Sequence, residues 1–372
     1  MAFTFLTPPE ILFGPDESRK TLDVARRFGS RIFLVTGARS FDALPISRML
    51  AGLNRWSVSG EPDVATVDEG VRRCGAADVV VAVGGGSVMD TAKAVAGVVP
   101  NGGSVRDYLE QVGDKKLSRA PLPFIAVPTT AGSGSEATKN AVIRVPDLKV
   151  KRSIRHDLLM PRVAIVDPTL PAAAPRDVAA SSALDAFTHL LEGYVSTGAH
   201  PMTDALALPG LALAAEGLRG IAAGRDAFLS MSQASLWGGI VLANAGLGAV
   251  HGLVAPLGGR CAIAHGIGCA CLLAETVRVN LAALRSRAKD SPALGRYEQA
   301  ALALGLQSAD DLLNLLAGFR RTFDLPALSS RGLTADDVAP IVKASRGGSM
   351  RFNPIELSDS ELEGILRAAM QA

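Results

Sequence analysis

The first half of the chain alternates short apolar runs with stretches of helical pattern. The apolar runs lie at residues 31–36, 78–83, 123–128 and 162–167, and glycine follows the first two at once. Continuous apolar runs of this length, separated by helical segments, are typical of parallel strands that are buried on both faces. We therefore predict a doubly wound, Rossmann-like α/β domain for this half of the chain.

The strand pattern stops after about Pro168. Alanine, leucine and glycine then dominate, and the pattern remains helical to the C-terminus. Asp177 is placed to cap a helix that runs through Asp185 and His189 towards Ser196. The sequence predicts two domains, an α/β domain over residues 1–170 and an all-α domain over residues 171–372.

Composition and charge limit the classes of molecule that we expect the protein to bind. The chain has 372 residues, of which 48% are hydrophobic and 20% charged, which suits a globular protein of two domains. A net charge of +2 gives no electrostatic reason to expect a nucleic acid or an anionic membrane as partner. The four cysteines form no C-x-x-C pair, so we expect them to be reduced and buried.

One long segment, residues 227–259, contains no Asp, Glu, Lys or Arg. A membrane span is the obvious alternative there. Its serines, its glycines, Gln233, Asn244 and His251 favour a buried helix pair instead. The N-terminus also lacks the positive segment of a signal peptide, so we expect a soluble, cytoplasmic protein.

A glycine-rich segment, residues 84–93, directly follows the second apolar run. Its glycines permit positive φ angles and a close backbone approach, and Ser87 with Asp90 has the form of a capping box. A strand, a glycine turn and a capped helix together present N–H groups and a positive dipole end to a pyrophosphate. The spacing is not G-x-G-x-x-G, so a tight turn without a ligand remains the alternative.

A second loop, residues 128–136, also follows an apolar run and is rich in hydroxyl groups and glycine. These groups could hydrogen-bond a nucleotide. Such loops are common, so this one adds little on its own.

Histidine is scarce, with five in the chain. Asp185 and His189 are four residues apart and would project from one face of a helix. His251 is expected on a later helix and His265 on the segment after it, in uncharged surroundings. Convergence on a divalent cation would satisfy all four buried polar groups. The alternative is that each histidine is a hydrogen-bonded core residue, and the spacing leaves both open.

Several motifs occur in an order and spacing that resemble the iron-containing (group III) alcohol dehydrogenase family over nearly the whole chain. They are residues 84–93, 128–136 and 164–168, Asp185–His189 with Glu192–Tyr194, and Ala249–His251 through His265–Gly266. The resemblance implies a metal-dependent, NAD(P)-linked alcohol dehydrogenase or aldehyde reductase. Hydride would pass between C4 of the nicotinamide and the carbon of an alcohol or carbonyl compound whose oxygen the metal holds.

The resemblance also assigns residues. The implied metal ligands are Asp185, His189, His251 and His265. The residues implied to contact the cofactor are Gly84, Gly85, Gly86, Ser87, Asp90, Thr129, Thr130, Ser133, Asn140 and either Lys151 or Lys149. Four protein ligands would close a tetrahedral zinc site, so the need for a fifth position favours Fe²⁺, with Zn²⁺ in an expanded shell as the alternative. The family further implies a homodimer, formed through the N-terminal segment, and a small alcohol or aldehyde as substrate.

The sequence departs from the family pattern at two places. Ala255 stands where many members have a histidine four residues after the third ligand, which puts a proton relay there in doubt and suggests a narrower or more apolar pocket. After the first apolar run, Gly37 replaces the acid that NAD-preferring members often carry. Arg39 and Ser40 could bind a 2′-phosphate, so we favour NADP over NAD, although Arg39 could also be a solvated surface residue.

Three other functions are alternatives to this one. A dehydroquinate synthase-like lyase, using NAD and a metal, needs Lys or Arg around an acidic substrate, and residues 227–259 offer none. A maleylacetate reductase-like enzyme works without metal, which the retention of Asp185 disfavours. A nucleotide-binding protein without catalysis predicts the loss of metal ligands, yet all four are present.

Overall fold

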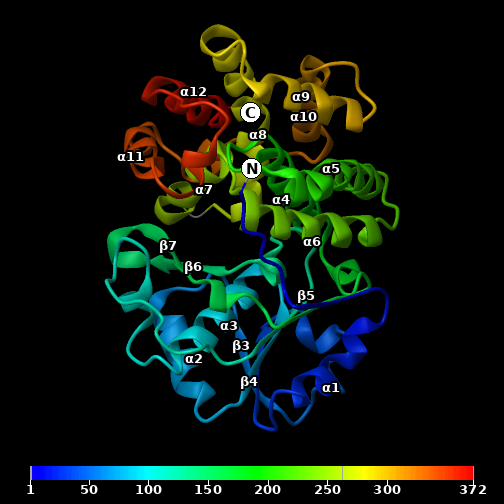
Figure 1. Ribbon diagram of the computed structural model, residues 1–372, viewed down its shortest axis with the longest axis vertical. Helices are drawn as coiled ribbons and strands as arrows, with labels where there is room; N and C mark the ends of the chain where they lie inside the picture. The colour runs from blue at the N-terminus through cyan, green and yellow to red at the C-terminus, as the bar shows by residue number, and fades with distance from the viewer. Residues whose placement is uncertain (1, 262, 372) are drawn as a thin grey trace. The chain divides into compact units, whose positions relative to one another are not determined.

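The structure is a computed structural model that describes residues 2–261 and 263–371 (Figure 1). It contains two compact units, Leu6–Pro175 and Arg176 to the C-terminus. The N-terminal residues up to Phe5 group with the second unit, which the sequence pattern does not predict. The first unit is built around a parallel sheet and the second is helical, as predicted.

The α/β unit holds a six-stranded parallel sheet with the order β1-β8-β5-β4-β2-β3. Its strands are β1 Glu10–Phe13, β2 Ile32–Gly37, β3 Asn54–Val58, β4 Val79–Gly84, β5 Phe124–Pro128 and β8 Val163–Val166. The helices of this unit are α1 Thr21–Arg26, α2 Val64–Cys74 and α3 Gly86–Val98. A separate antiparallel hairpin is formed by β6 Asn140–Val145 and β7 Val150–Arg155.

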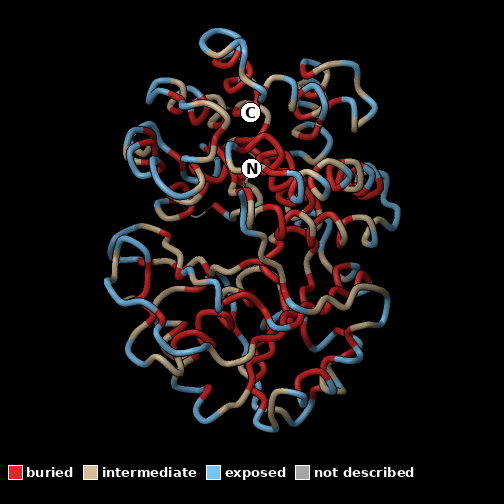
Figure 2. Tube along the Cα trace, viewed as in Figure 1, coloured by how far each residue is buried: buried red, intermediate tan, exposed pale blue. Residues whose placement is uncertain are grey.

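Hydrophobic residues cover both faces of the sheet because neighbouring residues of a strand point to opposite sides. Phe33, Val80 and Ala126 belong to one buried cluster, together with residues of α3 and the hairpin. Leu34, Val81 and other alternate residues belong to a second cluster, which includes residues of α1. Burial on both faces explains why β2, β4, β5 and β8 are continuous apolar runs in the sequence. Figure 2 shows these central strands as buried segments.

The second unit contains nine α-helices among its described residues. They are α4 Arg176–Val195, α5 Pro201–Ala222, α6 Phe228–Ala245, α7 Ala249–Arg260, α8 His265–Arg287, α9 Pro292–Ala303, α10 Ala309–Thr322, α11 Ala335–Ser345 and α12 Asp359–Ala369. Short 3₁₀ turns in the whole chain lie at Glu17–Lys20, Phe41–Ala43, Val105–Tyr108, Ser135–Ala137, Pro146–Leu148, Asp157–Leu159, Pro171–Ala173, Leu328–Arg331 and Gly348–Phe352.

Helices α4, α5 and α6 pack against one another through small residues. A Cβ at Gly193 would lie 2.2 Å from the side chain of Val241, and a Cβ at Gly210 would lie 2.7 Å from that of Leu190. Glycine therefore lets these helices approach closely. The C-terminal half of α4 is buried on every side, which places Asp185 and His189 in the interior of the unit.

The segment without charged residues forms the expected helix pair, α6 and α7, which meet at a bend of 97°. Helices α5 and α8 are long and apolar enough to cross a membrane by length and hydropathy alone, as is the bent pair if it is counted as one span. Of the most apolar 18-residue stretch of each helix, 50% is buried for α5 and 67% for α8. All four cysteines are free and buried, as predicted.

Candidate functional site

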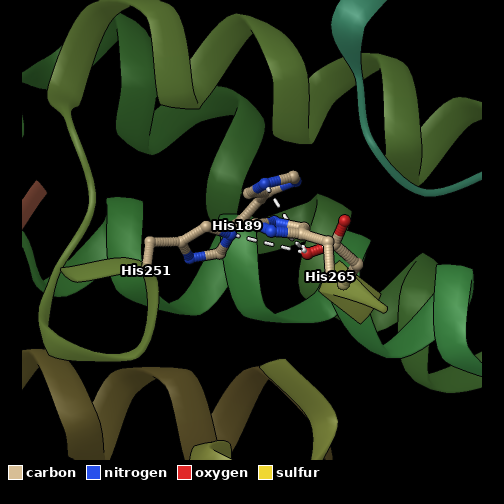
Figure 3. A group of neighbouring side chains, drawn as sticks. His189, His251 and His265 are labelled. Atoms are coloured by element: carbon tan, nitrogen blue, oxygen red, sulfur yellow. Dashed lines mark ion pairs between the residues drawn. The ribbon is translucent and has the colours of Figure 1, made fainter. Parts of the chain in front are cut away.

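The structure brings the four predicted metal ligands together. Asp185 and His189 lie one turn apart on α4, His251 lies in the first turn of α7, and His265 is the first residue of α8. One ligand atom from each residue lies within 4.8 Å of the other three. Figure 3 shows the three imidazoles turned towards one another. The predicted helix cap is wrong in one detail, since α4 begins at Arg176 and Asp177 lies inside its first turn.

The Asp185 carboxylate is the centre of this group. Its Oδ1 lies 3.4 Å from His251 Nε2, 3.6 Å from His265 Nε2 and 3.8 Å from His189 Nε2. This buried oxygen has no hydrogen-bond partner of good geometry among the described residues. Leaving a buried acceptor unpaired costs about 1–3 kcal/mol.

The donor set fits a divalent cation. Oxygen and nitrogen donors at about 2.1 Å from one tetrahedral ion lie about 3.4 Å apart, close to the separations around Asp185. Burial acts to raise the pKa of Asp185, but the neighbouring imidazoles, first His189 and then His265, bring it below its ordinary value. The carboxylate is therefore ionised, as a metal ligand must be.

Glu192 is a site residue that sequence reasoning did not assign. Its Oε2 lies 2.6 Å from His251 Nδ1, and its Oε1 accepts a hydrogen bond of 2.7 Å from the backbone N–H of Val250. A carboxylate on the far nitrogen of a histidine fixes the ring orientation and its tautomer. Glu192 therefore directs His251 Nε2 towards Asp185. In the sequence, its position two turns after Asp185 on the same predicted helix is the feature that could have pointed to it.

Two neighbours hold Glu192 and α7 in place. Gly248 precedes α7, and a Cβ there would lie 2.8 Å from Glu192 Oε1, so a side chain would displace the carboxylate. Asn353 Oδ1 accepts a hydrogen bond of 3.0 Å from the N–H of Ala249. The first N–H groups of α7 are thus satisfied by side chains from distant segments.

The group has one open side. The His265 side chain is 41% exposed, whereas those of Asp185, His189 and His251 are buried. An outside molecule can therefore reach the group beside His265.

The two predicted nucleotide loops lie side by side at the carboxyl ends of β4 and β5, which are neighbours in the sheet. The N–H of Thr129 donates to the carbonyl of Gly84 at 2.9 Å. A Cβ at Gly85 would lie 3.2 Å from Thr130, and a Cβ at Gly86 would lie 3.0 Å from Ser133. This is the edge of a parallel sheet at which nucleotides bind.

The glycines of the first loop provide the close backbone approach and do not use the positive φ that glycine permits. None of Gly84, Gly85 and Gly86 has a positive φ, and φ of Gly85 is −79°. Glycine provides space there, because a Cβ at Gly84 would lie 2.5 Å from Val88, and a Cβ at Gly85 or Gly86 would crowd the second loop.

The capping box of Ser87 and Asp90 does not form, since α3 begins at Gly86 and has no side-chain cap. Asp90 instead accepts hydrogen bonds from Ser135 Oγ at 2.9 Å and from the N–H of Val142 at 3.0 Å. Its carboxylate is thus used to join α3 to the second loop and to β6.

Lys93 has a role that the sequence did not reveal. It is fully buried on α3, and its Nζ donates to the carbonyls of Ser135 at 2.8 Å, Thr138 at 2.9 Å and Asn140 at 3.0 Å. Burial lowers the pKa of Lys93 to about 8, although Asp90 and Glu136 act in the opposite direction. Lys93 thus anchors the second loop and the start of β6 to α3, the helix that follows the first loop.

The residues predicted to contact the cofactor from the β6–β7 hairpin differ in burial and in their partners. Asn140 opens β6. Lys151 is buried and forms an ion pair of 2.5 Å with Glu61, whereas Lys149 is exposed in a turn with a φ of 52°.

The residues considered for the ribose site lie at the end of β2. Gly37 is the last residue of that strand, and Arg39 and Ser40 are exposed immediately after it. Among the described residues no ion pair involves Arg39. Nearby Arg55, in contrast, is paired with Asp42 at 2.6 Å and lies over the ring of Phe41.

Comparison with known proteins identifies one protein family for both units of the chain. Residues 8–168 match the model "Iron-containing alcohol dehydrogenase", and residues 179–370 match the C-terminal model of the same family. Alcohol dehydrogenase 4 of Saccharomyces cerevisiae is 31% identical over 99% of this chain and 98% of its own length. Long-chain-alcohol dehydrogenase 1 of Geobacillus thermodenitrificans is 42% identical over 57% of this chain and 55% of its own length.

Solved structures agree with the sequence comparison. An alcohol dehydrogenase from an archaeal halo-thermophile of a Red Sea brine pool has a TM-score of 0.91 and 27% identity, over 99% of each chain. Sulfoacetaldehyde reductase from Bifidobacterium kashiwanohense, in complex with NAD⁺, has a TM-score of 0.87 and 28% identity, over 100% of this chain and 99% of that one. The chain therefore belongs to the iron-containing alcohol dehydrogenase family and is an oxidoreductase that acts on CH–OH groups.

Proposed function

We propose that this enzyme interconverts a small alcohol and its aldehyde, with a divalent cation held by Asp185, His189, His251 and His265. The observation that carries the proposal is the convergence of these side chains from α4, α7 and α8 to within 4.8 Å. A bound divalent cation would supply Lewis acidity towards the oxygen of the substrate. Glu192 orients His251, and the exposed side of His265 admits the substrate.

The paired loops after β4 and β5 are the proposed site for the cofactor pyrophosphate. The α3 helix begins directly after Gly85, so its first N–H groups and positive dipole end lie beside the second loop. Lys93 holds that loop in position. A solved relative that binds NAD⁺ supports a nicotinamide cofactor at this site.

We propose NADP as the preferred form of that cofactor. Gly37 carries no charge that would repel a 2′-phosphate, and exposed Arg39 and Ser40 lie within three residues of it. Arg39→Ala should raise KM for NADPH and leave KM for NADH unchanged. Arg48→Ala, which removes an exposed arginine of the same unit, is the control. An equal effect of Arg39→Ala on the two cofactors would contradict the assignment.

The substrate is proposed to be a small and predominantly apolar aldehyde or alcohol. Ala255 lies on α7, one turn after His251, where a histidine would add a polar group near the cation. One curated relative, an NAD-dependent methanol dehydrogenase of Bacillus methanolicus, acts on an alcohol without a further hydroxyl group. Another, a lactaldehyde reductase of Escherichia coli, acts on a hydroxylated aldehyde, so the two alternatives differ at this point. A panel of short aldehydes, with and without further hydroxyl groups, would test this. Preference for the hydroxylated members would contradict an apolar pocket.

A cytoplasmic location and a homodimer are also proposed, both on the family resemblance. Fe²⁺ is the first candidate for the cation on the same basis. Reconstitution of the metal-free protein with Fe²⁺ or Zn²⁺, followed by NAD(P)H-linked assays on the aldehyde panel, tests the activity. Absence of turnover with every aldehyde and both cofactors would overturn it, and sedimentation of the purified protein tests the dimer.

A further inference from the structure

A buried asparagine lies at the start of α7, the helix that carries His251. Asn353 follows the 3₁₀ turn Gly348–Phe352 and is only 7% exposed. Its Oδ1 accepts a hydrogen bond of 3.0 Å from the N–H of Ala249, the first residue of α7. His251 is two residues further on, in the same helical turn. Asn353 therefore acts on the backbone that carries His251 and not on its ring.

Asn353 and Glu192 together cap α7. Glu192 accepts hydrogen bonds from the next two N–H groups of the helix, those of Val250 and His251, at 2.7 and 3.3 Å. The first N–H groups of a helix have no partner within it, and Gly248 has no side chain that could accept them. Three successive N–H groups thus depend on two side chains from other segments. Loss of either side chain would free the first turn of α7 to move.

Further contacts fix the direction of the Asn353 amide. Its Nδ2 donates to the carbonyl of Ile355 at 2.8 Å and to Asn280 Oδ1 at 2.7 Å. Asn280, on α8, donates to Asn353 Oδ1 at 3.3 Å and to the hydroxyl of Tyr297, on α9, at 3.1 Å. A reversed amide would turn its NH₂ towards the N–H of Ala249 and its oxygen towards two acceptors. Asn353 can therefore take only the orientation in which its oxygen faces α7.

The segment before Asn353 is held against the bend between α6 and α7. A Cβ at Gly246, directly after α6, would lie 2.5 Å from the ring of Phe352. The carbonyl of Phe352 accepts a hydrogen bond of 3.0 Å from the N–H of Thr197, just after α4. The amide of Asn353 thus reaches α7 from a segment that is itself fixed to α4 and α6.

The polar character of this cluster needs an explanation, because it is buried. Asn280 is 3% exposed and Tyr297 1%. Apolar side chains of similar size would fill the same space without the cost of removing two amides and a hydroxyl from water. What apolar side chains would not supply is an acceptor of fixed direction for α7. A satisfied buried network of this kind specifies one arrangement of the elements that it joins.

We propose that Asn353, held by Asn280, is a positioning residue for the ligand His251. It fixes the first turn of α7 so that His251 Nε2 stays 3.4 Å from Asp185 Oδ1, within the group of proposed ligand atoms. Glu192 orients the His251 ring, and Asn353 fixes the backbone from which that ring extends. The inference rests on the proposed function, because it concerns the affinity of that four-residue site for its cation.

The test uses the full-length protein and Co²⁺, whose visible absorption reports on the geometry of its ligands. Asn353→Leu removes the acceptor for the N–H of Ala249 and keeps a side chain of similar size. Its affinity for Co²⁺, measured by competition with a chelator, should fall about tenfold, and the visible bands of the bound ion should shift. Asn280→Leu should show the same changes to a lesser degree, and it decides the question if Asn353→Leu does not fold.

Asn101→Leu is the matched control. Asn101 is half-buried in the α/β unit, where its amide donates to the carbonyls of Gly97 at 2.8 Å and Arg119 at 3.0 Å. Its Oδ1 accepts from the N–H groups of Ser118 at 2.9 Å and Arg119 at 2.8 Å. Asn101→Leu should lose stability in urea, as Asn353→Leu does, and keep the Co²⁺ affinity and spectrum of wild type.

The outcomes separate this inference from the proposed function. A role of Asn353 in folding alone would lower the stability of the folded variants and leave their Co²⁺ affinity and spectrum unchanged, which would overturn the inference and leave the four-residue site intact. An equal loss of affinity in Asn101→Leu would also overturn it. If wild type bound no Co²⁺, both the inference and the metal-dependent function would fail.

Discussion

Glu192→Gln tests most sharply how Glu192 shapes the proposed metal site. The Glu192 carboxylate accepts hydrogen bonds from His251 Nδ1 at 2.6 Å, from the N–H of Val250 at 2.7 Å and from that of His251 at 3.3 Å. Glutamine has nearly the same volume, but it has one acceptor oxygen and an NH₂ group. Whichever way the amide turns, its NH₂ faces at least one N–H donor of α7.

The expected magnitude follows from those contacts. Loss of one hydrogen bond to a charged group lowers the free energy of unfolding by about 1.5–3 kcal/mol. Loss of the carboxylate that orients a metal-binding histidine weakens metal affinity about 10–100-fold. Metal affinity should fall more in Glu192→Gln than in a variant that loses an unrelated carboxylate, because His251 Nε2 is no longer held towards Asp185.

Chelator competition measures the affinity, and urea unfolding of the metal-free protein measures the stability. Glu298→Gln is the matched control, since Glu298 accepts a hydrogen bond of 2.8 Å from the N–H of Ala309 at the start of another helix, α10. The control should lose stability and keep its metal affinity. Metal affinity of Glu192→Gln equal to that of wild type would refute the assigned role of Glu192.

Other predictions concern the α/β unit. Gly37→Asp should raise KM for NADPH at least about tenfold, with Gly37→Asn as the uncharged control, because the nearest atom to a Cβ there is 3.5 Å away and an added carboxylate would repel a 2′-phosphate. Steady-state kinetics with NADPH and NADH would measure this. Burial raises the pKa of Glu136 from 4.5 to about 7. Between pH 4.5 and pH 7 the folded state therefore binds more protons than the unfolded state. The free energy of unfolding should fall by up to about 3 kcal/mol as the pH rises through this range. Urea unfolding at pH 5 and pH 8 should show that loss in wild type and a smaller one in Glu136→Gln. Lys93→Met should weaken NAD(P)H binding about tenfold or more, as measured by fluorescence titration, because the second loop loses the anchor that links it to α3.

The strands that could be predicted are those buried on both faces. Such strands, β2, β4, β5 and β8, have continuous apolar sequences that periodicity detects. The edge strand β3 is mostly exposed, and its sequence, Asn54–Val58, carries no such run. The β6–β7 hairpin alternates buried and half-buried residues over one strand and was also missed, because its burial depends on contacts with α3.

The candidate site, too, could be predicted only in part from the sequence. Asp185 and His189 could be paired from their spacing on one helix. Their meeting with His251 and His265 depends on how α8 packs against α4 and α7, and on the hydrogen bonds from Glu192 of α4 to α7. Glu192 and Lys93 stand in recognised motifs, yet their partners lie 58 to 59 and 42 to 47 residues away in the chain. Contacts over such separations are set by tertiary packing and leave no local pattern in the sequence.

The most direct test of the central claim is the metal dependence of turnover. Protein stripped with a chelator should reduce no aldehyde with NAD(P)H, and about one equivalent of a divalent cation per chain should restore activity. Asp185→Asn should fold, bind the cation far more weakly and stay inactive after reloading. Turnover by the metal-free protein, or full activity of Asp185→Asn without bound metal, would contradict the account.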